Sequence, residues 1–215
     1  MADDRLDAAT FHRNHGPLHQ VMLRHLPPDA TGEALEIASG SGQHAVAFAQ
    51  RWGQLRWTPS DIGAPQLTSI AAWRKDAIAD GVTNLAPPLM LDVTKPTALA
   101  AVSSDLRAIV AINLLHIAPW AVTEALVAGA GSQLGEGGQL FVYGPFHRHG
   151  RVSAPSNAAF DASLRARDAA WGVRHMEEVA DCAAGRGLDL TEVADVPADN
   201  FVLVFTRRAR ADALR

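Results

Sequence analysis

The stretch LEIASGSGQHA, residues 35–45, constrains most strongly what this chain can fold into. It runs from an apolar segment that indicates a strand into Gly40 and Gly42, and then into residues that begin a helix. Glycine permits a sharp turn and a close approach of the backbone to a ligand, and the first turn of a helix presents free N–H groups. Because ligands of open parallel sheets bind beyond the carboxyl ends of the strands, the stretch predicts a cofactor site at this turn.

Strand and helix signals alternate through most of the chain, which is typical of an α/β fold with a parallel sheet covered by helices on both faces. The predicted strands are 34–38, 54–61, 86–93, 106–115 and 137–144. The predicted helices are 42–52, 64–81, 119–134 and 174–185. Two further segments, 188–196 and 200–208, are joined by a short polar link, which indicates an antiparallel hairpin near the end of the chain.

Two segments interrupt this alternation, and connections longer than about 12 to 15 residues are usually functional or disordered. The first, about residues 11–26, is an N-terminal helical segment that we expect to begin at Pro17, since proline is favoured in the first turn of a helix. The second, about residues 145–172, is an insertion after the fifth predicted strand. We expect a single domain, 1–215, in which both segments cover the site as a lid or pocket wall.

The composition argues against several classes of protein. With 48% hydrophobic and 20% charged residues the chain is typical of a globular protein, and its net charge of −4 argues against a nucleic-acid partner. No apolar run reaches the roughly 18 residues of a membrane helix, and the first residues lack the order of a signal peptide, so we expect a cytoplasmic protein without a membrane partner. The single cysteine, Cys182, is expected to be a small apolar helix residue. The sequence predicts no particular oligomeric state.

Acidic residues lie at the first three predicted strands. Glu36 is inside the first strand, just before the glycines, while Asp61 and Asp92 end the second and third. Such a series suits a ligand that carries an ammonium group, a sulfonium, a ribose diol and an adenine amine, as S-adenosylmethionine does. The letters GSGQHA, with Asp61 near the expected offset, also match the dinucleotide pattern, which keeps an NAD-dependent oxidoreductase as an alternative. A pyrophosphate, however, gains nothing from Glu36.

Seven segments spread in order across nearly the whole chain carry a resemblance to a known family. They are RNHGPL, LEIASGSGQHAVAFA, WTPSD, AINLLHIAPW, YGPF, SNAAFDASLRARDAAWGVR and FVLVF. The chain resembles a class I S-adenosylmethionine-dependent methyltransferase and, more narrowly, the methyltransferase-like 26 family, formerly a domain of unknown function. The resemblance implies a Rossmann-like fold, with a seven-stranded, mostly parallel sheet, a terminal antiparallel strand and helices on both faces. His175 departs from the family pattern, in which we expect an acid after WGVR.

The resemblance also implies which residues bind the cofactor, S-adenosyl-L-methionine. It assigns the methionine part to Glu36, Gly40 and Gly42. It assigns the ribose hydroxyls to Asp61 and the adenine edge to Asp92.

Further cofactor contacts are expected from two other motifs. Arg13 and Asn14 match the N-terminal motif of the family and are expected to meet the methionine carboxylate. Asn113 and His116 follow the fourth predicted strand, where class I methyltransferases place residues beside the reacting methyl group. Asn113 is predicted to contact the cofactor. His116 is a candidate base, because an imidazole with a pKa near 6.5 accepts protons at cellular pH; the alternative is a hydrogen-bonded structural histidine.

The insertion and the strand before it supply candidates for the acceptor side. The predicted acceptor pocket consists of Tyr143, Phe146, Asn157 and Trp171. Asp161 and Arg165 are candidate catalytic residues, although their spacing of four also fits a surface ion pair on a helix.

His147 and His149 alternate as residues on one side of a strand do. That spacing permits a metal pair, but no cysteine or acid pattern completes a site, so no metal is predicted.

We therefore expect methyl transfer from S-adenosylmethionine to a small-molecule acceptor by in-line displacement. Two alternatives stay open at this point. One is the NAD-dependent oxidoreductase, and the other is a module that binds S-adenosylmethionine and transfers nothing. Whether oxygen, nitrogen or sulfur accepts the methyl group does not follow from the sequence.

Overall fold

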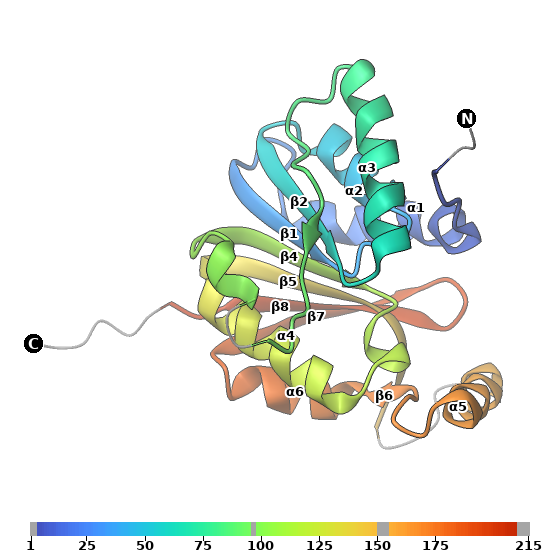
Figure 1. Ribbon diagram of the computed structural model, residues 1–215. Helices are drawn as coiled ribbons and strands as arrows, with labels where there is room; N and C mark the ends of the chain where they lie inside the picture. Colours follow the sequence, from blue (N-terminus) through green and yellow to red (C-terminus); the bar gives the residue numbers. More distant parts are fainter. Residues whose placement is uncertain (1–3, 96–97, 150–154, 210–215) are drawn as a thin grey trace, which may run out of the picture.

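A mostly parallel sheet of eight strands organises the protein (Figure 1). The computed structural model describes residues 4–95, 98–149 and 155–209. The strand order is β3-β2-β1-β4-β5-β8-β7, and β6 pairs with β5 beside this path. The strands are β1 (Gly32–Ile37), β2 (Leu55–Asp61), β3 (Leu89–Met90), β4 (Leu106–Ile112), β5 (Leu134–His147), β6 (Arg174–His175), β7 (Leu188–Val196) and β8 (Asn200–Arg207). β8 pairs antiparallel with both β5 and β7, so the predicted mostly parallel sheet with its terminal hairpin is confirmed. Seven strands form the main path, as predicted, and β6 is an additional strand.

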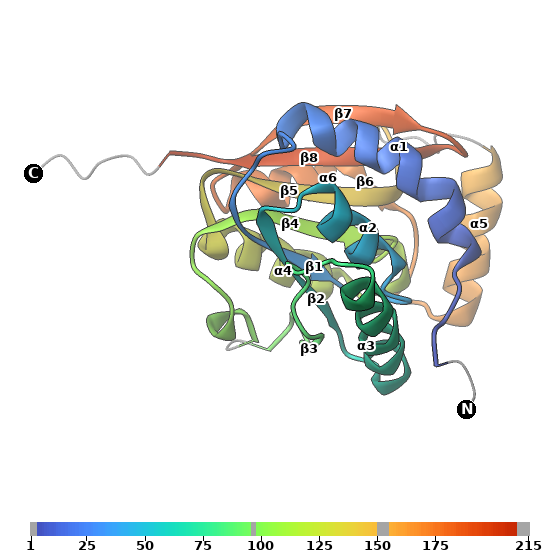
Figure 2. The same cartoon turned by 90° about the horizontal axis from the view of Figure 1, so that it is seen from above.

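Helices cover both faces of the sheet. They are α1 (Ala9–His25), α2 (Gln43–Arg51), α3 (Ala64–Ala79), α4 (Trp120–Gln133), α5 (Pro155–Arg167) and α6 (Met176–Ala184), with short 3-10 turns η1 (Ala98–Ala101) and η2 (Leu115–Ile117). The core cluster on one face includes residues of α1, α2 and α3, and the cluster on the other includes residues of α4 and α6. Seen from above, α5 lies at one end of the sheet, beside the end of α1 that is nearer the N-terminus (Figure 2).

The burial of the strands follows from their place in the sheet. The central strands β1 and β4 are buried along most of their length, as expected for parallel strands with both faces covered. The edge strand β7 exposes several of its residues. Within the described ranges, no helix is long and apolar enough to cross a membrane.

Three local predictions are wrong. Pro17 lies inside α1, which begins at Ala9, and does not open the helix. An interior proline removes one hydrogen bond and crowds the carbonyl four residues earlier, and the burial of Leu18 and Met22 offsets this cost and holds the helix across it. On α3, the helical spacing predicts that one side is formed by Leu67, Ile70, Ala71, Arg74 and Ile78. Ile78 is 44% exposed while Ala77 is buried, so the buried side is rotated from the predicted one. Residues 174–175 form β6 instead of the start of α6.

An aromatic and histidine cluster joins α1 to α2. The ring of His19 lies 5.3 Å from that of Phe48, and the ring of His44 lies 4.9 Å from that of Phe11. Burial lowers the pKa of His19 to about 4 and that of His44 to about 3. Both imidazoles are therefore neutral at pH 7, because protonating either one would place a positive charge among apolar rings.

The buried His44 predicts a loss of stability in acid. Its pKa is lower in the folded protein than the ordinary 6.5, so the unfolded chain binds the proton more tightly. The stabilisation is present above pH 6.5 and is lost as the pH falls toward 3. Compared with His44→Gln, the wild type should lose roughly 1–2 kcal/mol of unfolding free energy between pH 7 and pH 5, measured by denaturant titration.

The matched control is His149→Gln, because the His149 side chain is 79% exposed. It should leave the pH dependence of the wild type unchanged. Equal pH profiles for wild type and His44→Gln would contradict the burial argument.

Candidate functional site

The turn after β1 has the backbone that its glycines predict. Gly40 and Gly42 have φ angles of +58° and +91°, and Ala38 also has a left-handed φ of +57°. A Cβ on Gly42 would lie 2.9 Å from the Cα of Ile70, so Gly42 lets α2 approach α3. A Cβ on Gly40 would meet nothing within 4 Å. Gly40 thus faces open space, while Gly42 serves packing, and the strained Ala38 is a feature typical of functional sites.

Asp61, the last residue of β2, fixes this turn. Its Oδ2 accepts the N–H of Gly40 at 3.0 Å, and its Oδ1 accepts the N–H of Gly63 at 3.0 Å. The residue is 8% exposed. Each carboxylate oxygen has a second lone pair, so Asp61 can hold the turn and still accept two hydroxyl groups of a ligand.

A cavity of about 410 Å³ opens at the carboxyl ends of the strands. It brings together predicted cofactor residues that follow or end four different strands: Gly40, Asp61, Asp92 and Asn113. Asn113 has a left-handed φ of +56°. The volume lies in the usual range for small-molecule sites.

The cavity also has apolar walls that the sequence analysis missed. Ile62 and Ile117 line it and are 69% and 42% exposed. Large apolar side chains left open beside a concave polar site are typical of surfaces that a ligand covers. The only sequence signal was that Ile62 directly follows the acid at the end of β2.

Glu36 faces away from α4 and α6, on the face of the sheet that α1 and α2 cover. Leu35 and Ile37 belong to the core cluster under α4 and α6, so the alternation of a strand turns Glu36 toward α1 and α2. It is 2% exposed, and its Oε2 has no hydrogen-bond partner in the part of the chain that the structure describes. Burial raises the pKa of Glu36 to about 8; a hydrogen bond with the Ser39 side chain opposes the shift, and the charge of Asp61 adds a smaller increase. Glu36 does not line the 410 Å³ cavity, but a buried carboxyl oxygen without a partner next to the glycine turn suits a cationic group.

Tyr143 and Asn14 lie on this same side. Tyr143 belongs to the core cluster under α1 and is 2% exposed, and Asn14 of α1 is 7% exposed. Burial raises the pKa of Tyr143 to about 12, while the charge of Arg13 opposes the shift, so α1 brings Arg13 close to the phenol. Arg13 itself is exposed. The N-terminal motif therefore lies on the same face of the sheet as Tyr143, although its residues do not line the 410 Å³ cavity.

His116 lies in η2, between β5 and α5. Its ring is 5.5 Å from that of Phe160, and a Cβ on Gly144 would lie 3.4 Å from its Nδ1. Burial, helped by the charge of Arg174, lowers the pKa of His116 to about 4. The imidazole is neutral at pH 7 and can accept a proton. It does not line the 410 Å³ cavity.

Asp161 and Arg165 form the ion pair that their spacing allowed. Asp161 Oδ2 accepts Arg165 Nε–H at 2.8 Å, and its Oδ1 accepts the N–H of Val173 at 2.7 Å. The next residue back, Gly172, donates its N–H to the carbonyl of His116 at 3.0 Å. In this arrangement the pair braces the backbone that contacts His116.

The remaining predicted acceptor residues do not share one pocket wall. Phe146 is 1% exposed and packs in the core. Asn157 donates to the carbonyl of Asp199 at 3.2 Å, which ties α5 to the β7–β8 hairpin. Trp171 is half-buried, and the guanidinium of Arg167 lies 5.0 Å from its ring centre.

Arg174 is a site-supporting residue that the sequence analysis missed. Its guanidinium donates to the carbonyls of Leu115 at 3.1 Å, Ala118 at 2.5 Å and Ala170 at 2.8 Å. These bonds hold both ends of η2, which carries His116. The contacts are long-range and to backbone atoms, so no sequence pattern marks them.

The predicted pairing of His147 and His149 on one side of a strand is wrong. His147 is 5% exposed, with its ring 5.2 Å from that of His175, whereas the His149 side chain is 79% exposed. His149 has a φ of +56°, so the chain leaves the strand geometry before it. Among the described residues, no group of three or more potential ligands can hold a metal ion.

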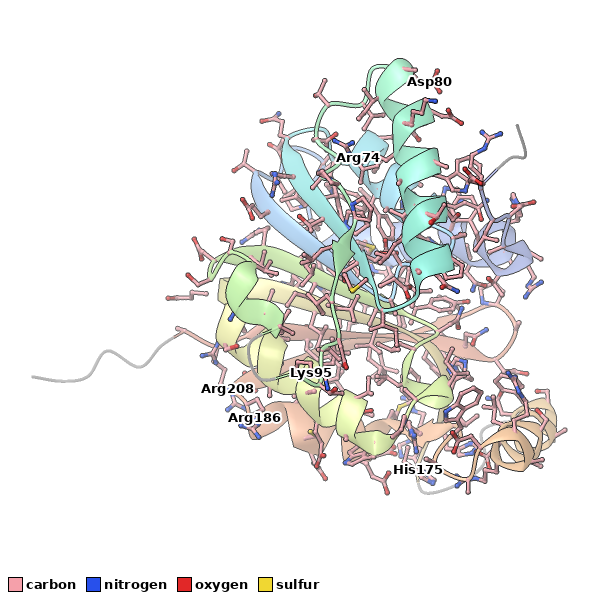
Figure 3. The ribbon with its side chains drawn as sticks, in the orientation of Figure 1. Arg74, Asp80, Lys95, His175, Arg186 and Arg208 are labelled. Atoms are coloured by element: carbon pink, nitrogen blue, oxygen red, sulfur yellow. The ribbon has the colours of Figure 1, made fainter. Side chains whose placement is uncertain are left out.

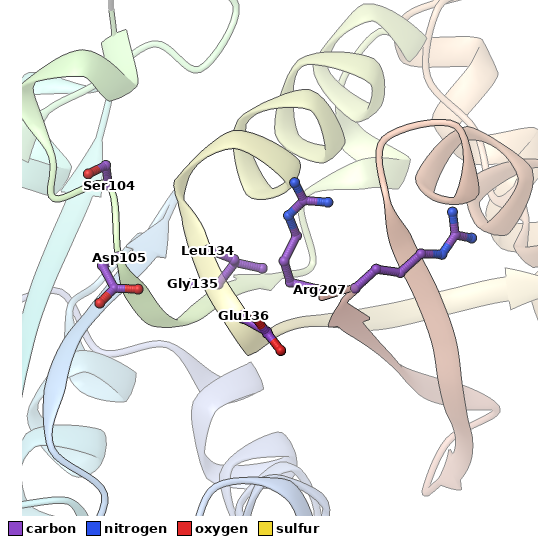
Figure 4. A pocket seen from close by; sticks show the side chains of 7 residues that line it. Ser104, Asp105, Leu134, Gly135, Glu136 and Arg207 are labelled. Atoms are coloured by element: carbon purple, nitrogen blue, oxygen red, sulfur yellow. The ribbon is translucent and has the colours of Figure 1, made fainter. Parts of the chain in front are cut away.

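A second cavity, of about 310 Å³, lies at the opposite edge of the sheet (Figure 4). It includes Asp105, Glu136, Arg207 and Arg208. Its arginines already bond within the protein: Arg207 to the Gly187 carbonyl at 3.0 Å and Arg208 to the Asp189 carboxylate at 2.8 Å. Arg208 lies far along the sheet from His175 (Figure 3).

Comparison with known proteins gives a family for the chain. Residues 5–207 match the family described as "Protein of unknown function (DUF938)". The chain belongs to the DUF938 family. The sequence resemblance placed the fold correctly, and the family description adds no activity.

Solved structures share the fold of this DUF938 protein. A candidate O-methyltransferase from Nostoc punctiforme aligns with a TM-score of 0.75, 18% identity, and 93% of this chain against 58% of that one. An O-methyltransferase family 2 protein from Planctomyces limnophilus, in complex with apigenin, aligns with a TM-score of 0.71 and 20% identity. The alignment covers 89% of this chain and 56% of that one. The S-adenosylmethionine-dependent methyltransferase SibL aligns with a TM-score of 0.63 and 18% identity. The alignment covers 93% of this chain and 58% of that one. The chain thus spans little more than half of these proteins, and the Rossmann-like methyltransferase fold is confirmed.

The orphaned Glu36 predicts a pH-dependent penalty. Its folded pKa of about 8 lies above the ordinary 4.5, so its contribution to stability is full below pH 4.5 and is lost as the pH rises through 8. Glu36→Gln removes the ionisation. At pH 9 the variant should exceed the wild type by about 3–5 kcal/mol in unfolding free energy, relative to their difference at pH 4.5.

Glu33→Gln, on the same strand but 37% exposed, is the matched control and should show no such trend. A difference between Glu36→Gln and wild type that stays constant from pH 4.5 to 9 would show that Glu36 is ionised at no cost.

Proposed function

We propose that this DUF938 protein transfers the methyl group of S-adenosylmethionine to a small-molecule acceptor. The observation that carries the proposal is the buried Glu36 carboxyl beside the glycine turn at the carboxyl end of β1, whose Oε2 has no hydrogen-bond partner among the described residues. An ammonium group beside it would lower its pKa and receive a charge-assisted hydrogen bond. We also propose that the chain is related to the methyltransferase-like 26 family, which its sequence resembles.

The two sides of the sheet edge would divide the cofactor between them. Glu36 would bind the ammonium group of the methionine part, with Arg13 and Asn14 toward its carboxylate. Asp61 would accept the ribose hydroxyls on its remaining lone pairs, because both its oxygens already face the turn. Asp92 and the apolar wall at Ile62 would hold the adenine. Gly40 leaves space for this approach, which a side chain would fill.

The alternative dinucleotide would gain less from this geometry. A pyrophosphate placed at the turn would lie near Glu36, and a carboxyl group whose pKa is raised by burial offers no compensating charge. Asp61 supports either cofactor, because both contain a ribose diol. The preference therefore rests on Glu36.

The acceptor would be bound on the side of β4 and β5. In the transfer, the acceptor atom forms a bond to the methyl carbon while the carbon–sulfur bond breaks, and the sulfonium becomes a neutral thioether. S-Adenosylmethionine supplies the reactivity. His116 would take the acceptor proton if the acceptor is a hydroxyl; its pKa of about 4 keeps it neutral at pH 7 but makes it a weaker base than an ordinary imidazole. Tyr143, with its pKa raised, stays protonated and can donate a hydrogen bond.

The segments expected to cover the site would exclude water from it. α1 carries Asn14 to the edge of the sheet, and α5 carries Phe160 against His116. We include Asn157 and Trp171 as supports of this wall, and Asp161 with Arg165 as its brace. Exclusion of water favours alignment of the acceptor with the methyl group. We place the activity in the cytoplasm, where a single free thiol, Cys182, is stable.

Ligand stabilisation tests the cofactor. At about a hundred times its dissociation constant, S-adenosylhomocysteine should add roughly 2.7 kcal/mol of stability and raise the melting temperature by several degrees. NAD and NADP should have no effect. Asp61→Ala should weaken binding at least about tenfold, since a hydrogen bond to a charged group contributes about 1.5–3 kcal/mol.

The control for Asp61→Ala is Asp105→Ala, in the cavity at the opposite edge, which should bind as the wild type does. Stabilisation by NAD alone would assign the site to the dinucleotide. Transfer is then tested with S-adenosylmethionine labelled on its methyl group and a small-molecule cell extract. Binding without any labelled product would leave a module that only holds the cofactor.

A further inference from the structure

The residues before α1 run in an ordered path along the middle and second half of α3 and reach the start of α2. We call residues 5–8 the N-terminal strap. The N–H of Leu6 donates to Ser69 Oγ at 2.8 Å, and the Leu6 carbonyl accepts Trp73 Nε1–H at 2.9 Å. Arg5 pairs with Asp76 at 2.6 Å. These bonds fix the strap on α3.

The strap is also fixed on the first residue of α2. Gln43 Oε1 accepts the N–H of Ala8 at 2.8 Å, and Gln43 Nε2–H donates to Asp7 Oδ1 at 2.8 Å. Gln43 is 5% exposed and Ser69 is fully buried. Because these side chains are buried away from water, breaking their hydrogen bonds to the strap would leave polar groups without partners, which is costly.

The same two side chains hold the glycine turn. Ser69 Oγ–H donates to the carbonyl of Ser41 at 2.7 Å, and Ser41 Oγ–H donates to Gln43 Oε1 at 2.9 Å. Ser41 stands between Gly40 and Gly42. Ser69 therefore receives the strap and holds the turn through one hydroxyl, and Gln43 does both through one amide oxygen.

We propose that Ser69 and Gln43 are positioning residues that couple the N-terminal strap to the cofactor turn. This inference rests on the proposed function. The turn has three residues with left-handed φ and little side chain of its own, so bonds from outside keep it in place. The strap continues directly into α1, which carries Arg13 and Asn14. A ligand on the turn and docking of the strap then favour each other, because coupling between two sites is reciprocal.

The coupling predicts effects on affinity from residues that do not line the ligand cavity. Ser69→Ala should weaken binding of S-adenosylhomocysteine about five- to tenfold by calorimetric titration. Thr68→Ala is the matched control, because its hydroxyl bonds only within its own helix, to the carbonyl of Ala64 at 3.0 Å. It should bind within twofold of the wild type.

Hydrogen exchange separates positioning from general support. S-Adenosylhomocysteine should slow exchange at the Leu6 and Ala8 amides in the wild type and in Thr68→Ala, but not in Ser69→Ala. Gln43→Ala should repeat the result of Ser69→Ala and serves in its place if that variant does not fold. A Ser69→Ala protein that is less stable yet binds with the affinity of Thr68→Ala would overturn the proposal.

A failure of the proposed function would look different. If the wild type binds no S-adenosylhomocysteine, the cofactor assignment is wrong, and exchange without ligand still tests the coupling. Ser69→Ala should then speed exchange both in the strap and at the amides of 40–43. Faster exchange in the strap with an unchanged turn would overturn the coupling itself.

Discussion

The hydrogen bond from the Gly40 N–H to the Asp61 carboxylate holds the centre of this structure together. It joins the turn after β1 to the end of β2, so it sets where α2 begins and where the cavity opens. Gly42 depends on the same turn, since its lack of a side chain lets α2 lie against Ile70 of α3. A ligand at Asp61 therefore meets a carboxylate that is already oriented, and preorganisation of this kind reduces the entropy lost on binding.

Sequence patterns were sufficient for the sheet and for the meeting of several predicted residues at one cavity. Buried parallel strands such as β1 and β4 form apolar runs that are visible without a structure. Carboxyl ends of parallel strands meet at one edge, and this geometry brings Asp61, Asp92 and Asn113 to one cavity although they are far apart in sequence. Local pattern and topology together predicted that outcome.

Contacts between side chains and distant backbone atoms could not be predicted from the sequence. Arg174 bonds to the carbonyls around η2, and Ser69 bonds to Leu6 and Ser41, with no periodic pattern that marks either. Pro17 was misjudged because its local preference for helix starts was overridden by the burial of α1. The pairing of His147 with His149 failed because one backbone angle, the positive φ of His149, ends the strand alternation.

In the proposed complex Glu36 meets a cationic group of the ligand, and the protonation state of Glu36 tests this contact most directly. With a pKa of about 8, the free protein holds a proton on Glu36 at pH 7, and an ammonium partner would displace it. Calorimetric titration of S-adenosylhomocysteine at pH 7, in two buffers that differ in ionisation enthalpy, measures this exchange. The account predicts release of close to one proton in the wild type and none in Glu36→Gln. Binding with no proton release in the wild type would contradict it.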